Sequence, residues 1–112
     1  MTTAITETQV IDIHVEAIEA ARKAESDFIA QYGETPYCGF AWVDIYGVRS
    51  NSKVGKALQK IGFRKSYTKS LQLWNPGGSY TQSMDIKETG AQAYANILRK
   101  HGIQAYMGSR AD

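Results

Sequence analysis

Apolar residues recur at helical spacing through the first third of the chain. Between positions 6 and 32 they fall three, four and seven residues apart and form one stripe: Val10, Ile11, Ala17, Ile18, Ala21, Ala24 and Phe28. This period predicts a long amphipathic helix that Thr6 or Thr8 caps and Gly33 ends. His14 lies on the stripe, and we expect it to be packed or partly buried rather than to act as a ligand or base.

The segment 37–48, YCGFAWVDIYGV, alternates between two kinds of side chain and predicts a strand. One face carries small and β-branched residues, which are typical of a packed face. The other face carries larger side chains, namely Cys38, Phe40, Trp42, Asp44 and Tyr46. Two interpretations of its aromatic residues stay open. They form a second core layer beneath the long helix, which we favour, or a platform on which nucleic-acid bases stack.

Further elements follow in short succession. Residues 52–61 predict a helix with Ser50 or Ser52 as its cap and Gly62 as its stop, and residues 67–74 predict a second strand. The Asn-Pro-Gly-Gly sequence at 75–78 breaks that strand, and we expect a positive φ at one of its two glycines. A helix over 85–101 begins with Asp85-x-x-Glu88, a capping-box pattern, and residues 103–107 predict a third strand.

The order α-β-α-β-α-β predicts an α+β domain of two layers, a small three-stranded sheet with helices packed on it. Because a helix connects each strand to the next, neighbouring strands are expected to be parallel. A chain of 112 residues supports one domain. Within it we expect a long N-terminal helix at 1–34, an αβ core at 35–108 and a tail at 109–112.

Composition and hydropathy exclude several classes of protein. Hydrophobic residues make up 43% of the chain, which is typical of a globular domain. No apolar run approaches the roughly 20 residues of a membrane span, so no membrane partner is expected. The N-terminus lacks the pattern of a signal peptide, and the single cysteine, Cys38, forms no internal disulfide. We therefore expect a cytoplasmic protein.

Charge is distributed unevenly along the chain. Residues 1–34 contain seven acidic and two basic residues. Residues 45–84 contain no acidic residue and seven basic ones: Arg49, Lys53, Lys56, Lys60, Arg64, Lys65 and Lys69. Such a segment attracts phosphates through its local potential, and it is equally suited to pair with the acidic helix of a second copy.

In a parallel sheet, the loops 47–53 and 75–84 leave the same edge and lead into helix N-termini, where anionic ligands bind. We therefore predict a phosphate cradle formed by Arg49, Ser50, Asn51, Ser52, Lys53, Lys56, Lys60, Arg64, Lys65, Asn75, Gly77 and Gly78. The second loop also offers Ser79, Tyr80, Thr81, Gln82 and Ser83. Neither loop matches a known phosphate-binding motif, and the alternative is that these polar residues only cap helices.

Catalytic and metal-binding motifs are missing from the sequence. It contains no HExxH, CxxC or GxSxG pattern, and its two histidines, His14 and His101, are far apart. We therefore expect a binding protein rather than an enzyme, with no catalytic residue, cofactor or metal.

The sequences GFAWVDIYGVRSNSKVGKAL and LQLWNPGGSYTQSMD resemble small uncharacterised accessory proteins of tailed bacteriophages. The resemblance covers residues 38–108 and assigns no role to any residue. It implies a binding function in the host cytoplasm, such as blocking a host factor, sequestering a nucleotide signal or coating nucleic acid.

Two functional hypotheses result. The first is that the basic face at 49–69 holds a phosphate-bearing ligand, which is nucleic acid or a nucleotide. The alternative is a protein-interaction or self-assembly module without a nucleic-acid ligand. Under either hypothesis we expect a homodimer that packs through the alanines of the first helix, at positions 17, 20, 21 and 24.

Overall fold

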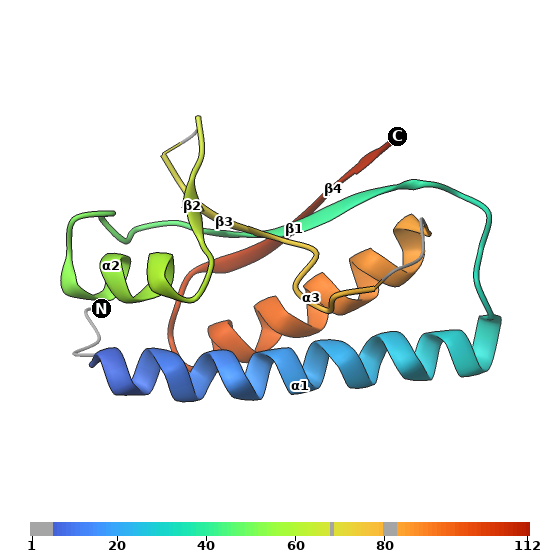
Figure 1. The fold of residues 1–112 in the computed structure, drawn as a ribbon, viewed down its shortest axis with the longest axis horizontal. Helices are drawn as coiled ribbons and strands as arrows, with labels where there is room; N and C mark the ends of the chain where they lie inside the picture. Colours follow the sequence, from blue (N-terminus) through green and yellow to red (C-terminus); the bar gives the residue numbers. More distant parts are fainter. Residues whose placement is uncertain (1–5, 68, 80–82) are drawn as a thin grey trace.

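The computed structural model describes residues 6–67, 69–79 and 83–112. Within these ranges the chain forms three helices and four strands (Figure 1). In chain order they are α1 (Glu7–Tyr32), β1 (Gly39–Ile45), α2 (Lys53–Lys60), β2 (Arg64–Lys65), β3 (Leu71–Trp74), α3 (Met84–Lys100) and β4 (Ala105–Ala111). The α+β class is confirmed, whereas the expected order lacked one strand.

The sheet has four strands in the order β2-β3-β1-β4, and each neighbouring pair is antiparallel. The expectation of a three-stranded sheet with parallel neighbours is therefore wrong. The crossover through α2 does make β2 parallel to β1, but the two strands are separated by one position. The chain then turns back after β2 and fills that position with β3, which gives a split β-α-β arrangement.

Two strand boundaries differ from the sequence prediction. The strand expected at 67–74 is the second arm of a hairpin, because β2 precedes it and Ser66 N–H donates to Ser70 O over 3.0 Å to close the turn. Lys69 takes a φ of 63° in that turn. The last strand continues to Ala111, which pairs with Gly39, so the expected tail belongs mostly to the sheet.

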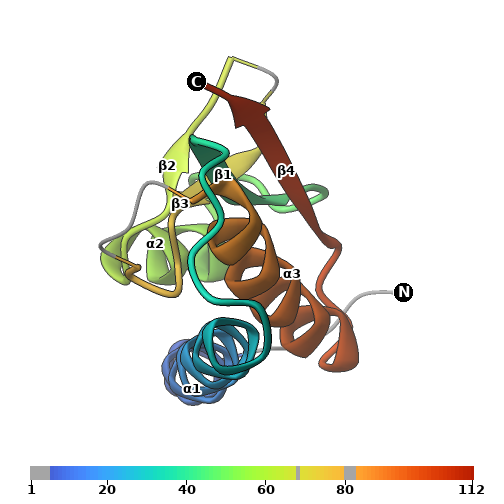
Figure 2. The same cartoon turned by 90° about the vertical axis from the view of Figure 1, so that its right-hand side faces the viewer.

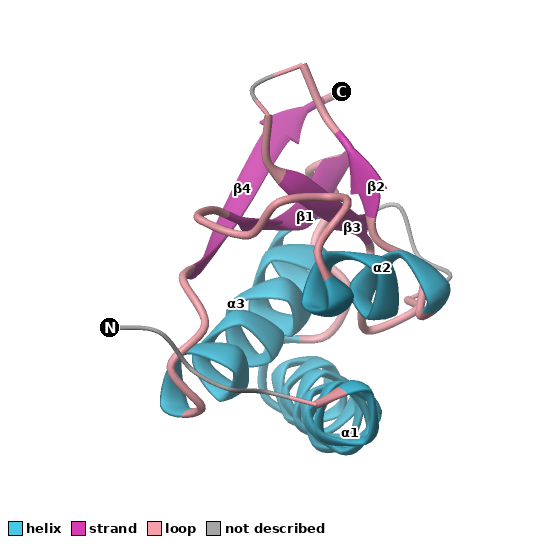
Figure 3. Cartoon of the chain, turned by 90° about the vertical axis from the view of Figure 1, so that its left-hand side faces the viewer, coloured by secondary structure: helices cyan, strands magenta, loops and turns pink. Residues whose placement is uncertain are grey.

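The helices form two layers on one side of the sheet (Figures 2 and 3). Helix α3 packs on β1 and β4, and α2 packs on β3. Helix α1 packs in turn on α3 and α2. The molecule therefore has three layers, not two, because the long helix covers other helices rather than the sheet. No helix in the described part of the chain is long and apolar enough to cross a membrane.

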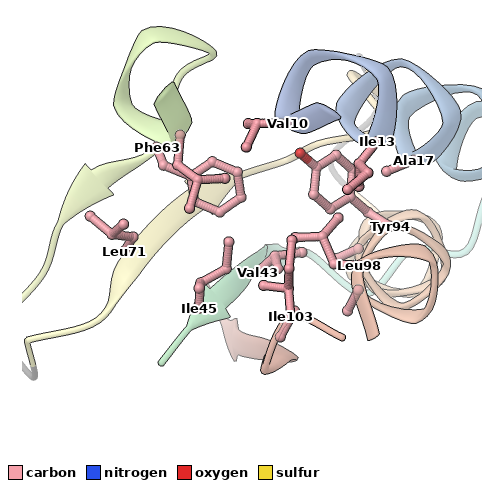
Figure 4. Close-up of a cluster of buried hydrophobic side chains, with 14 of the residues drawn as sticks. Val10, Ile13, Ala17, Val43, Ile45, Phe63, Leu71, Tyr94, Leu98 and Ile103 are labelled. Atoms are coloured by element: carbon pink, nitrogen blue, oxygen red, sulfur yellow. The ribbon is translucent and has the colours of Figure 1, made fainter. Parts of the chain in front are cut away.

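The core lies between the sheet and these helices (Figure 4). Ala41, Val43 and Ile45 of β1 are almost fully buried, as their small and β-branched side chains predicted. The aromatic side chains of β1 point to the opposite face. The interpretation that they form a core layer beneath the long helix is therefore wrong. Small residues occupy the covered face because α3 approaches closely: a Cβ on Gly39 would lie 2.5 Å from the Met84 sulfur.

The caps are mostly those that the sequence predicted. Thr6 caps α1 in a capping box with Gln9, and Gly33 ends the helix. Helix α3, however, is capped by Ser83, whose Oγ accepts a hydrogen bond from Ile86 N–H, so the capping box predicted at Asp85 is wrong. Gly78 has a φ of 72°, which confirms the expected positive φ in the 75–78 break.

The alanine stripe of α1 is occupied within the chain. Ala17 and Ala21 are fully buried in the core, on a helix that packs mainly on α3. The stripe does allow close helix–helix contact, as expected, but the neighbouring helix is α3 of the same chain. The prediction that this stripe joins two copies is therefore wrong.

Candidate phosphate-binding site

The two loops of the predicted cradle lie at opposite ends of the sheet. Because β1 and β3 are antiparallel, Ile45 at the end of β1 pairs with Leu71 at the start of β3. The loop after β1 therefore lies beside the β2–β3 turn, far along the sheet from the loop after β3. Asn75, Gly77 and Gly78 do not join Arg49, and Tyr80, Thr81 and Gln82 of the second loop lie outside the described residues.

A surface hollow of about 790 Å³ takes the place of the predicted cradle. It lies between the β1–α2 loop and the β2–β3 hairpin. Its lining residues are Gly47, Val48, Arg49, Ser50, Asn51, Lys65, Ser66, Lys69, Ser70 and Leu71. Three cations therefore meet there, all on exposed residues, and none of the described lining residues is acidic. Of the predicted cradle, Arg49, Ser50, Asn51 and Lys65 come together.

The wall formed by the β1–α2 loop is fixed onto α2. Ser52 Oγ accepts a 3.0 Å hydrogen bond from Gly55 N–H and donates to Arg49 O over 2.6 Å. Gln59 Nε2 donates to Ser50 O over 2.7 Å. A Cβ at position 55 would lie 2.0 Å from Arg49 O, so a glycine is needed where the loop folds back. Ser52 therefore caps α2, as expected under the alternative interpretation that the polar residues of this loop only cap helices.

The opposite wall is a hairpin anchored to the sheet. The Oγ atoms of Ser66 and Ser70 lie 2.7 Å apart, and Ser70 Oγ donates to Asp44 Oδ1 over 3.0 Å. Lys65 and Lys69 flank this anchored turn. The sequence identified Lys69 as part of the basic segment but not of the cradle, because only the hairpin turn brings its side chain to the hollow.

The remaining cations of the basic segment lie elsewhere. Lys53 and Lys56 are exposed on α2 and do not line the hollow. Lys60 forms a 2.8 Å ion pair with Glu7 of α1, and Arg64 on β2 faces Gln72 across the strands. The seven basic residues therefore form several surface groups, of which the hollow gathers three.

Several titratable side chains with shifted pKa values lie among the helices. His14 Nδ1 lies 2.7 Å from the Tyr94 hydroxyl, which confirms that His14 is packed, and burial lowers its pKa and raises that of Tyr94. Hydrogen bonds from Lys100 and then from His101 lower the pKa of Glu16. No cluster of three or more metal-ligating side chains occurs among the described residues.

Glu25 is a buried acid that sequence reasoning missed. It is 5% exposed, and its Oε2 makes no hydrogen bond with any described residue. The carboxyl group lies between Gly77 and Gly90, where a Cβ would come within 2.0 and 2.1 Å of Oε2. Burial raises its pKa to about 7, with Arg22 opposing the shift. Its position four residues after Ala21, on the apolar stripe of α1, is the sequence feature that indicates burial.

Comparison with protein-family models, curated proteins and solved structures gave no match for this chain. The resemblance to bacteriophage accessory proteins therefore stays a prediction. The three cations that line the hollow, with no acidic residue among its described lining, are suited to binding polyanions.

Proposed function

We propose that this chain binds a phosphate-bearing ligand, nucleic acid or nucleotide, in the hollow between the β1–α2 loop and the β2–β3 hairpin. One observation carries the proposal: Arg49 from one wall and Lys65 and Lys69 from the other converge on a hollow whose described lining contains no carboxylate. A site with this charge pattern favours ligands that carry several negative charges close together.

The energetics agree with a phosphate ligand. A cation and a phosphate in contact near a protein surface attract each other by roughly 1–4 kcal/mol before desolvation and side-chain ordering are counted. Arg49 adds a planar fork of donors that matches two phosphate oxygens, whereas the two lysines act as point charges. Hydrogen bonds hold Ser50 and Ser52 in one wall and Ser66 and Ser70 in the other, which limits the ordering that these residues undergo on binding.

Two charge-reversed variants test the proposal. Arg49→Glu with Lys65→Glu changes the hollow, and Lys53→Glu with Lys56→Glu makes the same change of charge on α2. We expect the first variant to lose most of its affinity for a fluorescein-labelled oligothymidylate and the second to lose little. The slope of log affinity against log salt should fall by roughly 0.7 for each phosphate that the variant no longer neutralises.

The test also identifies failure clearly. Equal losses of affinity in the two variants would mean that the ligand responds to overall charge rather than to the hollow. If the parent protein binds neither the oligothymidylate nor a nucleoside triphosphate saturably at low salt, the proposal is wrong.

A further inference from the structure

No described helix covers the outer face of the sheet (Figure 3). A row of aromatic side chains lies on that face. Trp42 on β1 pairs with Trp74 on β3 in the antiparallel register. Their rings stack with centroids 4.6 Å apart and an interplanar angle of 26°. Phe40 meets Trp74 edge to face at 6.0 Å, and Tyr106 lies on the neighbouring strand opposite Asp44.

The Trp42 indole is held in position from two sides. Its Nε1 donates a 3.0 Å hydrogen bond to Asp44 Oδ2 on the same face of β1. Opposite Trp42 on β4 is Gly108, where a Cβ would lie 2.6 Å from Nε1. The glycine therefore leaves room for the ring to lie across the neighbouring strand. A preordered ring of this kind loses little conformational entropy when a ligand stacks on it.

The aromatic row is accessible to a ligand. Trp74 is 47% exposed and Tyr106 is 48% exposed. A smaller polar residue would also fit at either of these solvent-facing strand positions. Exposed aromatic groups that contact one another mark binding surfaces more often than isolated exposed residues do.

Three arginines lie beside the row and one carboxylate, Asp44, lies within it, and this net positive charge favours one kind of occupant. The Arg110 guanidinium lies 5.7 Å from the centre of the Phe40 ring, and that of Arg99 lies 5.4 Å from the centre of the Tyr106 ring. Arg64 is exposed on β2, across from Gln72 of the same sheet. An apolar protein surface makes no specific interaction with these cations. A chain of bases linked by phosphates stacks on the rings and also pairs with the cations.

Asp44 connects this row to the hollow. Its Oδ2 accepts from Trp42 on the aromatic row, and its Oδ1 accepts from Ser70, which lines the hollow. A single carboxylate therefore links the aromatic row to a residue that lines the hollow. A ligand that binds at Arg49, Lys65 and Lys69 and also reaches the aromatic row has to extend past Ser70 and Asp44.

We infer that the ligand is single-stranded nucleic acid, whose backbone binds in the hollow and whose bases stack on Trp74 and its aromatic neighbours. This inference rests on the proposed function and narrows its ligand class. Duplex DNA or RNA does not fit the arrangement, because its bases are already stacked on one another and present their edges rather than their faces. Either sugar is compatible with stacking, so the shared chemistry is an unpaired base on a phosphate backbone.

The decisive experiment compares an eight-residue oligothymidylate with an abasic oligomer of the same length and charge, in fluorescence anisotropy titrations. The parent protein should bind the oligothymidylate more tightly, by between roughly fivefold and 150-fold if one base stacks. Trp74→Ala should remove most of this preference for the oligothymidylate and leave abasic binding unchanged. Tyr32→Ala, which removes an exposed aromatic ring from α1, should change neither affinity.

Quenching of tryptophan emission tests the same point without a mutation. The oligothymidylate should quench the emission of the parent protein, and the abasic oligomer should not. An eight-residue oligouridylate should behave like the oligothymidylate, and a duplex of matching length should bind no more tightly than the abasic oligomer.

The possible failures are distinguishable. If both oligomers bind equally and Trp74→Ala has no effect, the stacking inference is overturned while phosphate binding in the hollow stands. If the duplex binds more tightly than the single strand, the inference is also overturned. If neither oligomer binds, or binding is insensitive to Arg49→Glu with Lys65→Glu, the proposed function itself fails. Trp74→Phe, which keeps a ring, should retain preference for the oligothymidylate over the abasic oligomer.

Discussion

Asp44 and Trp42 are joined on the outer face of the sheet by a 3.0 Å hydrogen bond from indole Nε1 to carboxylate Oδ2. The other oxygen of Asp44 accepts from Ser70, so one side chain orders both the central aromatic ring and the base of the basic hairpin. Because the carboxylate accepts from both neutral donors, its removal leaves two donors to find new partners or water.

Asp44→Ala should accordingly destabilise the protein by about 1–3 kcal/mol, and Asp44→Asn, which keeps one acceptor oxygen, by less. Urea unfolding followed by circular dichroism measures both. An Asp44→Ala protein as stable as the parent would show that the bond does not order this surface.

Glu25 predicts an unusual dependence of stability on pH. Its pKa is raised by burial from an ordinary value of 4.5 to about 7. Between these values the folded state holds a proton that the unfolded state has released, so the stabilising contribution is complete below about 4.5 and is lost as the pH rises through about 7. As the pH rises from 5.5 to 8.5, the melting temperature of the parent should therefore fall by several degrees more than that of Glu25→Gln.

The comparison with Glu25→Gln is needed because His14 contributes with the opposite sign. Burial lowers the pKa of His14, so its contribution is lost as the pH falls. Subtracting the Glu25→Gln profile from that of the parent removes the contribution of His14. A flat difference profile would show that the Glu25 carboxyl group is not buried in solution.

Gly90→Ala tests the position of that carboxyl group independently. A Cβ at position 90 would lie 2.1 Å from Glu25 Oε2, so the alanine has to displace the carboxyl group. The gain in helix propensity, about 1 kcal/mol, offsets part of the packing energy that this displacement removes. We expect a small net change in stability at pH 8.5, together with the same loss of pH dependence as in Glu25→Gln. A pH profile like that of the parent would contradict the observed packing.

Ala21→Glu tests the role of the alanine stripe. Ala21 is fully buried within the chain, so a glutamate there places a charge in the core and should cost about 3 kcal/mol or more. Ala30→Glu, at an exposed position of α1, should melt like the parent. If Ala21→Glu keeps the melting temperature of the parent and instead changes its mass in light scattering, the stripe is an interface between copies after all.

The local structure of this chain could be predicted from the sequence because local signals determine it. Thr6, Ser52 and Gly33 cap or end their helices as their residue types predict. The alternation from Gly39 to Ile45 separates the packed residues from the aromatic ones correctly. These features depend on side-chain size and on hydrogen bonds between neighbours in the chain.

The arrangement of the strands could not be predicted in the same way. Arg64 and Lys65 form a two-residue strand with no apolar alternation, so the hairpin and the reversed direction of β3 leave no periodic signal. That reversal moves Asn75 away from the candidate site and brings Lys69 to it. The aromatic face of β1 was expected to lie beneath the long helix, but α1 packs on α3 and α2 instead of on the sheet.

The most direct test of nucleic-acid binding on this surface is a nuclear magnetic resonance titration that maps where an eight-residue oligothymidylate binds. We predict that amide shifts change most at residues 47–51, 64–66 and 69–74, and on the aromatic face at Trp42 and Tyr106. Saturable changes at these positions, reduced in Arg49→Glu with Lys65→Glu, would support binding on this surface. Changes confined to α1 or to Lys53 and Lys56 on α2, or no changes at low salt, would contradict it.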